Sequence, residues 1–175
     1  MTGLTRRASA SARAVPQASA SPDRWRDGAG AAMATSMATV DRLLERSDAE
    51  LVAATFSSEP AERFVHAHLA ALRAGAALVE ARAALSGTRA ARRGRPRPVW
   101  ELVAALEPGL SGWTAVFAAA APLRAAVETG RGDVDNDRAD LALTSAEAFG
   151  DEVRQLLAGA RSLGVAGRGA ALRAS

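Results

Sequence analysis

Alanine occupies 45 of the 175 positions of this sequence, and the larger apolar residues between the alanines recur with the period of an α-helix. A chain that is rich in Ala and Leu but has only four Phe and three Trp favours helices over sheets. The pattern therefore predicts an all-α fold, an up-and-down bundle of four long helices plus one short helix. The expected long helices cover residues 36–54, 59–85, 110–129 and 137–160, and the short helix covers 98–107.

Two terminal segments and one internal loop fall outside this helical period. Residues 1–34 are rich in Ser, Ala and Arg and have no apolar stripe, so we expect a disordered N-terminal tail. Residues 35–160 form the expected bundle, with a basic loop at 87–97 between the second long helix and the short one. Residues 161–175 contain several Gly and Arg residues, and we expect a flexible C-terminal tail.

The distribution of charge is more informative than the high isoelectric point. All 22 basic side chains are Arg, and Lys, Tyr and Cys are absent, so that a formal charge of only +3 persists to very high pH. Residues 1–26, 89–97 and 161–175 carry net charges of +4, +5 and +3, which leaves −9 on the rest of the chain. The expected bundle is therefore acidic, and net charge alone does not indicate nucleic-acid binding.

The composition excludes several kinds of site. Without Cys, the chain has no disulfide, no zinc–thiolate site and no thiol nucleophile. Two His residues are too few for a metal site built from His alone, and the acidic residues do not form a pair of Glu-x-x-His motifs. Because a glycine-rich phosphate loop is also missing, we expect neither a metal ion nor a cofactor.

No apolar run in the sequence approaches the roughly 20 residues that cross a bilayer. The longest weakly polar stretch, residues 115–126, is interrupted by Pro122 and Arg124. The N-terminal segment also lacks the apolar core of a signal peptide. We therefore expect a cytoplasmic protein that does not bind membranes.

Arg63, His66 and His68 are the candidate catalytic residues of the chain. A His can act as acid or base near neutral pH, and a neighbouring Arg can stabilise a phosphate. Arg63 and His68, however, lie roughly 140° apart around a regular helix and cannot converge on one atom. The alternative interpretation, which we favour, is that His68 is a structural residue on the apolar face and that His66 is solvated.

The loop at 87–97 is the candidate nucleic-acid contact. Guanidinium groups spaced by Gly and Pro could follow a phosphate backbone. No aromatic residue interleaves them, so a base-stacking platform is not indicated. The alternative is a mobile loop that rests against the acidic bundle. The arginines concerned are Arg89, Arg92, Arg93, Arg95 and Arg97.

Three segments carry a family resemblance. They read AERFVHAHLAALRAGAALVEARA, then RPRPVWELVAALEPGLSGWTAVFAAAAPLRAAVETG, then DRADLALTSAEAF. The run R-F-x-x-A-H-L-A-A-L-R-A, followed by V-W-E-L and by a Trp in the next helix, is its most specific part. Over roughly residues 40–157 the chain resembles a small actinobacterial family of HEPN-domain proteins.

This resemblance implies a helical bundle with an RNA-related role. Many HEPN proteins are metal-independent ribonucleases, often toxins or defence components, and they commonly dimerise. Their signature is an Arg and a His with four to six residues between them, which Arg63 and His68 match. In such an enzyme a ribose 2′-hydroxyl attacks the adjacent phosphate, His68 or His66 serves as acid or base, and Arg63 stabilises the developing charge.

Other HEPN proteins lack catalytic residues and act as RNA-binding or protein-interaction modules. For this chain we expect a non-catalytic, regulatory module of that kind, a homodimer whose partner is RNA or a protein such as an antitoxin. The alternative is a metal-independent endoribonuclease that uses the Arg63–His68 motif at a dimer groove.

Overall fold

The computed structural model describes the backbone of residues 22–86 and 97–173, and the side chains of residues 30–86, 97–160 and 162. This part of the chain consists of α-helices and one short 3-10 turn and contains no strand. The elements are α1 (Pro22–Phe56), α2 (Pro60–Leu85), α3 (Val99–Leu106), the 3-10 turn η2 (Pro108–Leu110), α4 (Ser111–Glu128) and α5 (Asn136–Arg173). The prediction of an all-α fold with four long helices and one short helix is confirmed.

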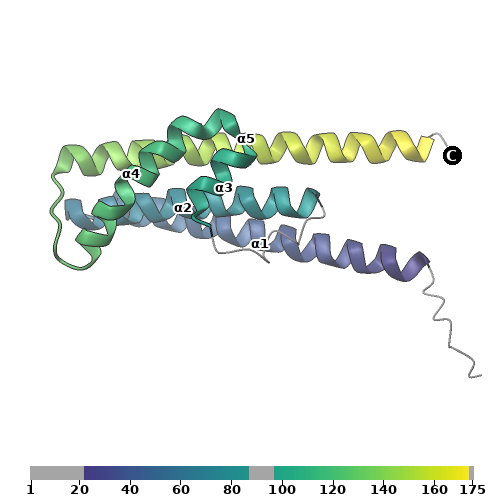
Figure 1. The fold of residues 1–175 in the computed structure, drawn as a ribbon, viewed down its shortest axis with the longest axis horizontal. Coiled ribbons are helices and arrows are strands. Elements are labelled where there is room, and N and C mark those ends of the chain that lie inside the picture. The colour runs from purple at the N-terminus through teal and green to yellow at the C-terminus, as the bar shows by residue number, and fades with distance from the viewer. Residues whose placement is uncertain (1–21, 87–96, 174–175) are drawn as a thin grey trace, which may run out of the picture.

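α2 is the central helix, because it packs against both α1 and α5, while α3 and α4 cross over it obliquely (Figure 1). Ion pairs join helices that are distant in sequence. Arg154 of α5 pairs with Asp48 of α1, and Arg82 of α2 pairs with Glu107, which follows α3. The short α3 thus lies against the C-terminal half of α2 and positions the start of α4.

The first and last helices extend beyond the boundaries that the sequence pattern predicts. α1 begins at Pro22, although residues 1–34 were expected to form a disordered tail, and α5 continues to Arg173, although the bundle was expected to end at 160. Both boundaries were placed where the apolar stripe ends, but helix formation does not require burial. Neither extension contains a proline after Pro22, which suits a first turn, so every residue beyond it keeps the N–H that a helical hydrogen bond needs.

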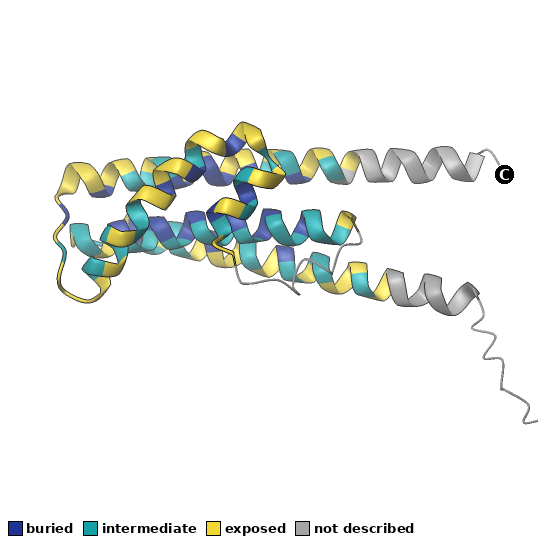
Figure 2. Ribbon diagram, in the orientation of Figure 1, coloured by how far each residue is buried: buried dark blue, intermediate teal, exposed yellow. Residues whose placement is uncertain are grey.

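Small side chains on α2 allow its neighbours to approach closely. A Cβ atom at Gly75 would lie only 3.3 Å from the Trp100 ring and 3.4 Å from Val103, so α3 packs directly against the α2 backbone there. The stacked rings of Trp100 and Phe117 have centroids 5.1 Å apart, and Phe149 of α5 contacts both (Figure 2 shows the buried positions along each helix). The buried alanines of α2 are Ala67, Ala70, Ala71, Ala74, Ala77 and Ala81.

Ser47 provides a buried polar contact between α1 and α2. Its Oγ donates a 2.9 Å hydrogen bond to the backbone carbonyl of Ala70, and the residue is 1% exposed. Replacing Ser47 with Ala removes this bond and should lower the free energy of unfolding by about 1 kcal/mol, measured by urea denaturation. Ser36→Ala is the matched control, because it makes the same change in helix propensity in the same helix. Equal stability of the two variants would contradict a role for the Ser47 hydrogen bond.

α4 has an apolar outer surface. Among the described residues, the segment Pro108–Glu128 is the one helical stretch that is long and apolar enough to cross a membrane by length and composition. Its inner side buries Thr114 and Phe117, whereas Val116 is 54% exposed. Arg124 pairs with Glu128 one turn further along at 2.5 Å. The stretch is apolar because most of its solvent-facing positions are Ala, Gly, Pro or Val.

Candidate functional site

Arg63 lies in the first turns of α2 and joins three elements. Its Nη1 atom donates to Asp140 Oδ1 at 2.6 Å and to Asn136 Oδ1 at 3.4 Å, both in the first turns of α5. Its Nη2 atom donates to the carbonyl oxygen of Ser57, just after α1, at 3.1 Å. The Arg63 side chain is only 17% exposed. This guanidinium is therefore engaged within the bundle and links the ends of α1, α2 and α5.

His68 lies in the hydrophobic core. It is 2% exposed, and its ring lies 5.8 Å from Phe117, 6.0 Å from Trp100 and 6.5 Å from Phe64, measured between ring centroids. Burial, together with the smaller effect of the Arg124 charge, lowers the pKa of His68 to about 4. The imidazole is therefore neutral at pH 7, and apolar rings surround it.

The structure does not bring Arg63 and His68 together. Arg63 contacts Ser57 and Asp140 at the ends of α1 and α5, whereas His68 contacts Trp100 of α3 and Phe117 of α4. The two side chains thus leave α2 on different sides, as their spacing of five residues in a regular helix requires. Within one chain they do not share a groove.

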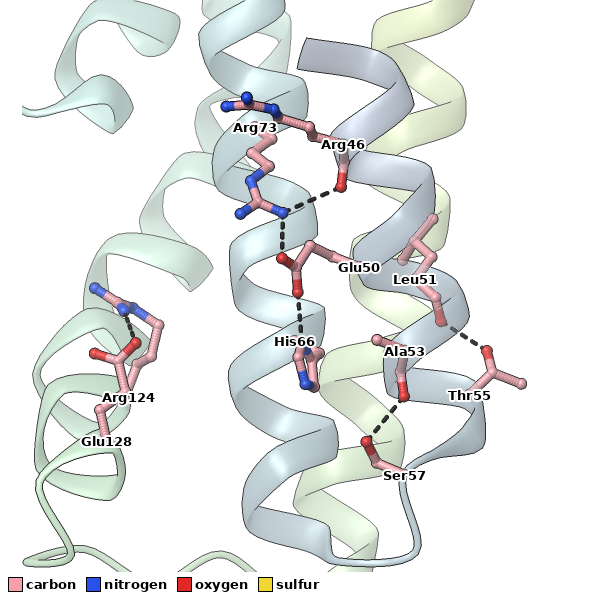
Figure 3. Close-up of polar contacts among 10 residues, drawn as sticks. All are labelled: Arg46, Glu50, Leu51, Ala53, Thr55, Ser57, His66, Arg73, Arg124 and Glu128. Carbon is pink, nitrogen blue, oxygen red and sulfur yellow. Dashed lines mark hydrogen bonds and ion pairs between the residues drawn. The ribbon is translucent and has the colours of Figure 1, made fainter. Parts of the chain in front are cut away.

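His66 belongs to a polar cluster between α1 and α2 (Figure 3). Its Nδ1 atom lies 2.5 Å from Glu50 Oε2, and Arg73 pairs with the other oxygen of the same carboxylate. Arg73 Nη1 also donates to the carbonyl oxygen of Arg46 at 3.2 Å. The side chains of His66, Glu50 and Arg73 are 35%, 14% and 31% exposed. Residues of α1 and α2 thus form a partly exposed cluster of titratable side chains.

The carboxylate of Glu50 organises this cluster. Burial raises the pKa of Glu50, but the hydrogen bonds from His66 and Arg73, together with their charges, outweigh burial and hold the pKa below its ordinary value. Glu50 is therefore ionised at neutral pH and fixes the His66 ring through Nδ1. The second ring nitrogen, Nε2, points away from Glu50 (Figure 3). A carboxylate-oriented imidazole with a free nitrogen can accept or donate a proton.

Glu50 and Arg73 were not among the residues singled out from the sequence. One signal was available for Arg73, which follows His66 by seven residues and so shares its face of α2. Glu50 lies next to Leu51 at the edge of the apolar stripe of α1, where a charged side chain can reach a neighbouring helix.

Four arginines of the basic loop, Arg89, Arg92, Arg93 and Arg95, lie outside the described residues. Arg97 is described and exposed, and its Nε atom lies 3.4 Å from Glu101 Oε2, one turn into α3. The described part of the chain contains no group of three or more His, Asp or Glu side chains that could hold a metal ion.

Comparison with known proteins agrees with this fold. A family model described as HEPN_SAV_6107-like HEPN matches residues 54–154, more than half of the chain. The matched range contains Arg63, His66, His68 and Arg73, but it begins after Glu50. Searches of curated proteins and of solved structures return no match. The family model confirms the resemblance noted in the sequence, and the chain belongs to the HEPN_SAV_6107-like HEPN family.

Proposed function

We propose that this protein is a non-catalytic, RNA-related HEPN module with a regulatory role. Membership of the HEPN_SAV_6107-like HEPN family supports a HEPN-type domain that is RNA-related or nuclease-like. The observation that supports a non-catalytic role is the burial of His68 among three rings, on a different side of α2 from the engaged guanidinium of Arg63. An acid or base has to come within hydrogen-bonding distance of its substrate, and the His68 ring is surrounded by protein.

A second candidate function, metal-independent RNA cleavage, is favoured by the contact between Glu50 and His66. His66 is the more exposed of the two imidazoles, and Glu50 orients it from the Nδ1 side. In this version Nε2 of His66 accepts the proton of a ribose 2′-hydroxyl, whose oxygen attacks the adjacent phosphorus and forms a 2′,3′-cyclic phosphate. The bond from phosphorus to the 5′-oxygen breaks, and this oxygen leaves as a hydroxyl after taking a proton from solvent. Arg73 supplies positive charge near the phosphate.

Incubation of the full chain with labelled single-stranded RNA in the presence of EDTA should leave the RNA bound but intact. Fluorescence anisotropy measures binding, and a denaturing gel measures cleavage. Failure of the wild-type protein to bind RNA would contradict the proposal.

Three variants separate the alternatives if cleavage is observed. A loss of about 100-fold or more in His66→Gln, with activity retained in Arg63→Gln, would establish the second candidate. Loss in both Arg63→Gln and His68→Leu, with the helical circular dichroism spectrum unchanged, would establish catalysis by the Arg63–His68 motif.

A further inference from the structure

A shallow hollow of about 200 Å³ lies on α1 and is lined by Thr39, Arg42, Leu43 and Arg46. These residues precede the segment that the family model matches, and none of them is a candidate residue of the family motif. Pockets that hold drug-sized ligands measure roughly 300–1,000 Å³, so this hollow suits a smaller group.

The two arginines of the hollow differ from most of the other arginines whose side chains the structure describes. Both are exposed, and neither has a carboxylate partner among the described residues. Arg42 Nε donates to the carbonyl oxygen of Ala38 at 3.3 Å, and Nη2 donates to Thr39 Oγ1 at 3.1 Å, which holds the guanidinium over the hollow. In contrast, an Asp or Glu pairs with each of Arg63, Arg73, Arg82, Arg97, Arg124 and Arg154.

Arg42 and Arg46 bring two guanidinium groups to the hollow, although acidic residues also lie on this stretch of α1. Arg42 and Arg46 are four residues apart on one helix, so their guanidinium groups are neighbours and repel each other. Arg73 adds a third guanidinium, because it donates to the Arg46 carbonyl (Figure 3). Glu50, which follows Arg46 by one helical turn, is already shared between Arg73 and His66. An anion with several acceptor oxygens would relieve this repulsion.

We propose that Arg42 and Arg46 bind a backbone phosphate of single-stranded RNA. The inference rests on the proposed function and names the surface that performs it. Guanidinium groups bind phosphate oxygens through paired hydrogen bonds, and the small hollow accommodates a phosphate group while the rest of the strand stays in solvent. A strand seated there continues along the α1–α2 surface past Arg73 to His66.

The test is RNA affinity, measured by fluorescence anisotropy with labelled oligouridylate over a range of salt concentrations. The double variant Arg42→Gln/Arg46→Gln should bind about tenfold more weakly than the wild type. Its salt slope, d log K/d log[salt], should shrink by about 0.7, the change expected when one phosphate contact of a single strand is lost. The matched control is Arg131→Gln/Arg138→Gln, which removes the same charge from exposed arginines whose guanidinium groups also pair with no carboxylate of the described residues.

Each result is informative. Equal weakening by the two double variants would show that net charge alone sets affinity, and it would overturn the site while leaving the proposed function intact. Wild-type protein that does not bind RNA would overturn both. Displacement of the RNA by AMP at the same phosphate concentration would show that the hollow takes mononucleotides, and would also overturn the inference. Circular dichroism spectra matching that of the wild type establish that both variants are folded.

Discussion

Replacing His68 with Ala should lower the free energy of unfolding by about 3 kcal/mol. The side chain is 2% exposed and contacts the rings of Phe64, Trp100 and Phe117, so its removal leaves a cavity where α2, α3 and α4 meet. Tight packing around the site limits how far the neighbours can collapse into that space. Urea denaturation followed by circular dichroism measures the loss.

Two further variants make this result interpretable. His68→Leu keeps most of the volume and should cost less than about 1.5 kcal/mol, because the site is lined by apolar rings. Leu141 is 67% exposed, so Leu141→Ala should change the free energy of unfolding by less than about 0.5 kcal/mol. A His68→Ala protein as stable as the wild type would contradict the structural role of the imidazole.

The wild-type protein should also lose about 2 kcal/mol of stability between pH 7 and pH 5, through His68 alone. Burial, with the charge of Arg124, lowers the pKa of this imidazole to about 4, against an ordinary value of 6.5 in the unfolded chain. Between these two values the unfolded chain binds a proton that the folded protein excludes. Stability is therefore complete above pH 6.5 and falls as the pH decreases towards 4.

Comparison with His68→Leu isolates this contribution. Urea denaturation at pH 7, 6 and 5 should show a pH dependence in the wild type that is about 2 kcal/mol larger than in the variant. Glu50, whose pKa lies below the ordinary 4.5, loses its contribution only at lower pH, outside the measured range. Parallel pH profiles for the two proteins would contradict the lowered pKa of His68 in the folded protein.

The helices and the side of α2 that holds His68 could be predicted from the sequence. Phe64, His68 and Leu72 are spaced by four residues, and such positions share one side of a helix whatever surrounds it. The same geometry separates Arg63 from His68. Local periodicity was sufficient for these conclusions because each concerns a single helix.

The cluster of Glu50, His66 and Arg73 could not be predicted in the same way. It depends on which turns of α1 meet which turns of α2, and the α2 side of this interface consists largely of alanines. Small, similar side chains fit a neighbouring helix in several alignments, so the pattern does not select one. The ends of α1 and α5 were misplaced for a different reason. An apolar stripe reports which positions are buried and does not mark where a helix begins or ends, and both helices extend past the expected boundaries.

The ion pairs of α5 have a consequence for the register of the bundle. Asp140 pairs with Arg63 and Arg154 pairs with Asp48, at points about 21 Å apart along α5. Asp140 and Asp48 are 63% and 56% exposed, and such surface pairs add little to stability. A shift of α5 by one helical turn, about 5.4 Å, would nevertheless break both pairs at once. In a bundle whose alanines tolerate sliding, Arg63 therefore selects one alignment of α5 over its neighbours.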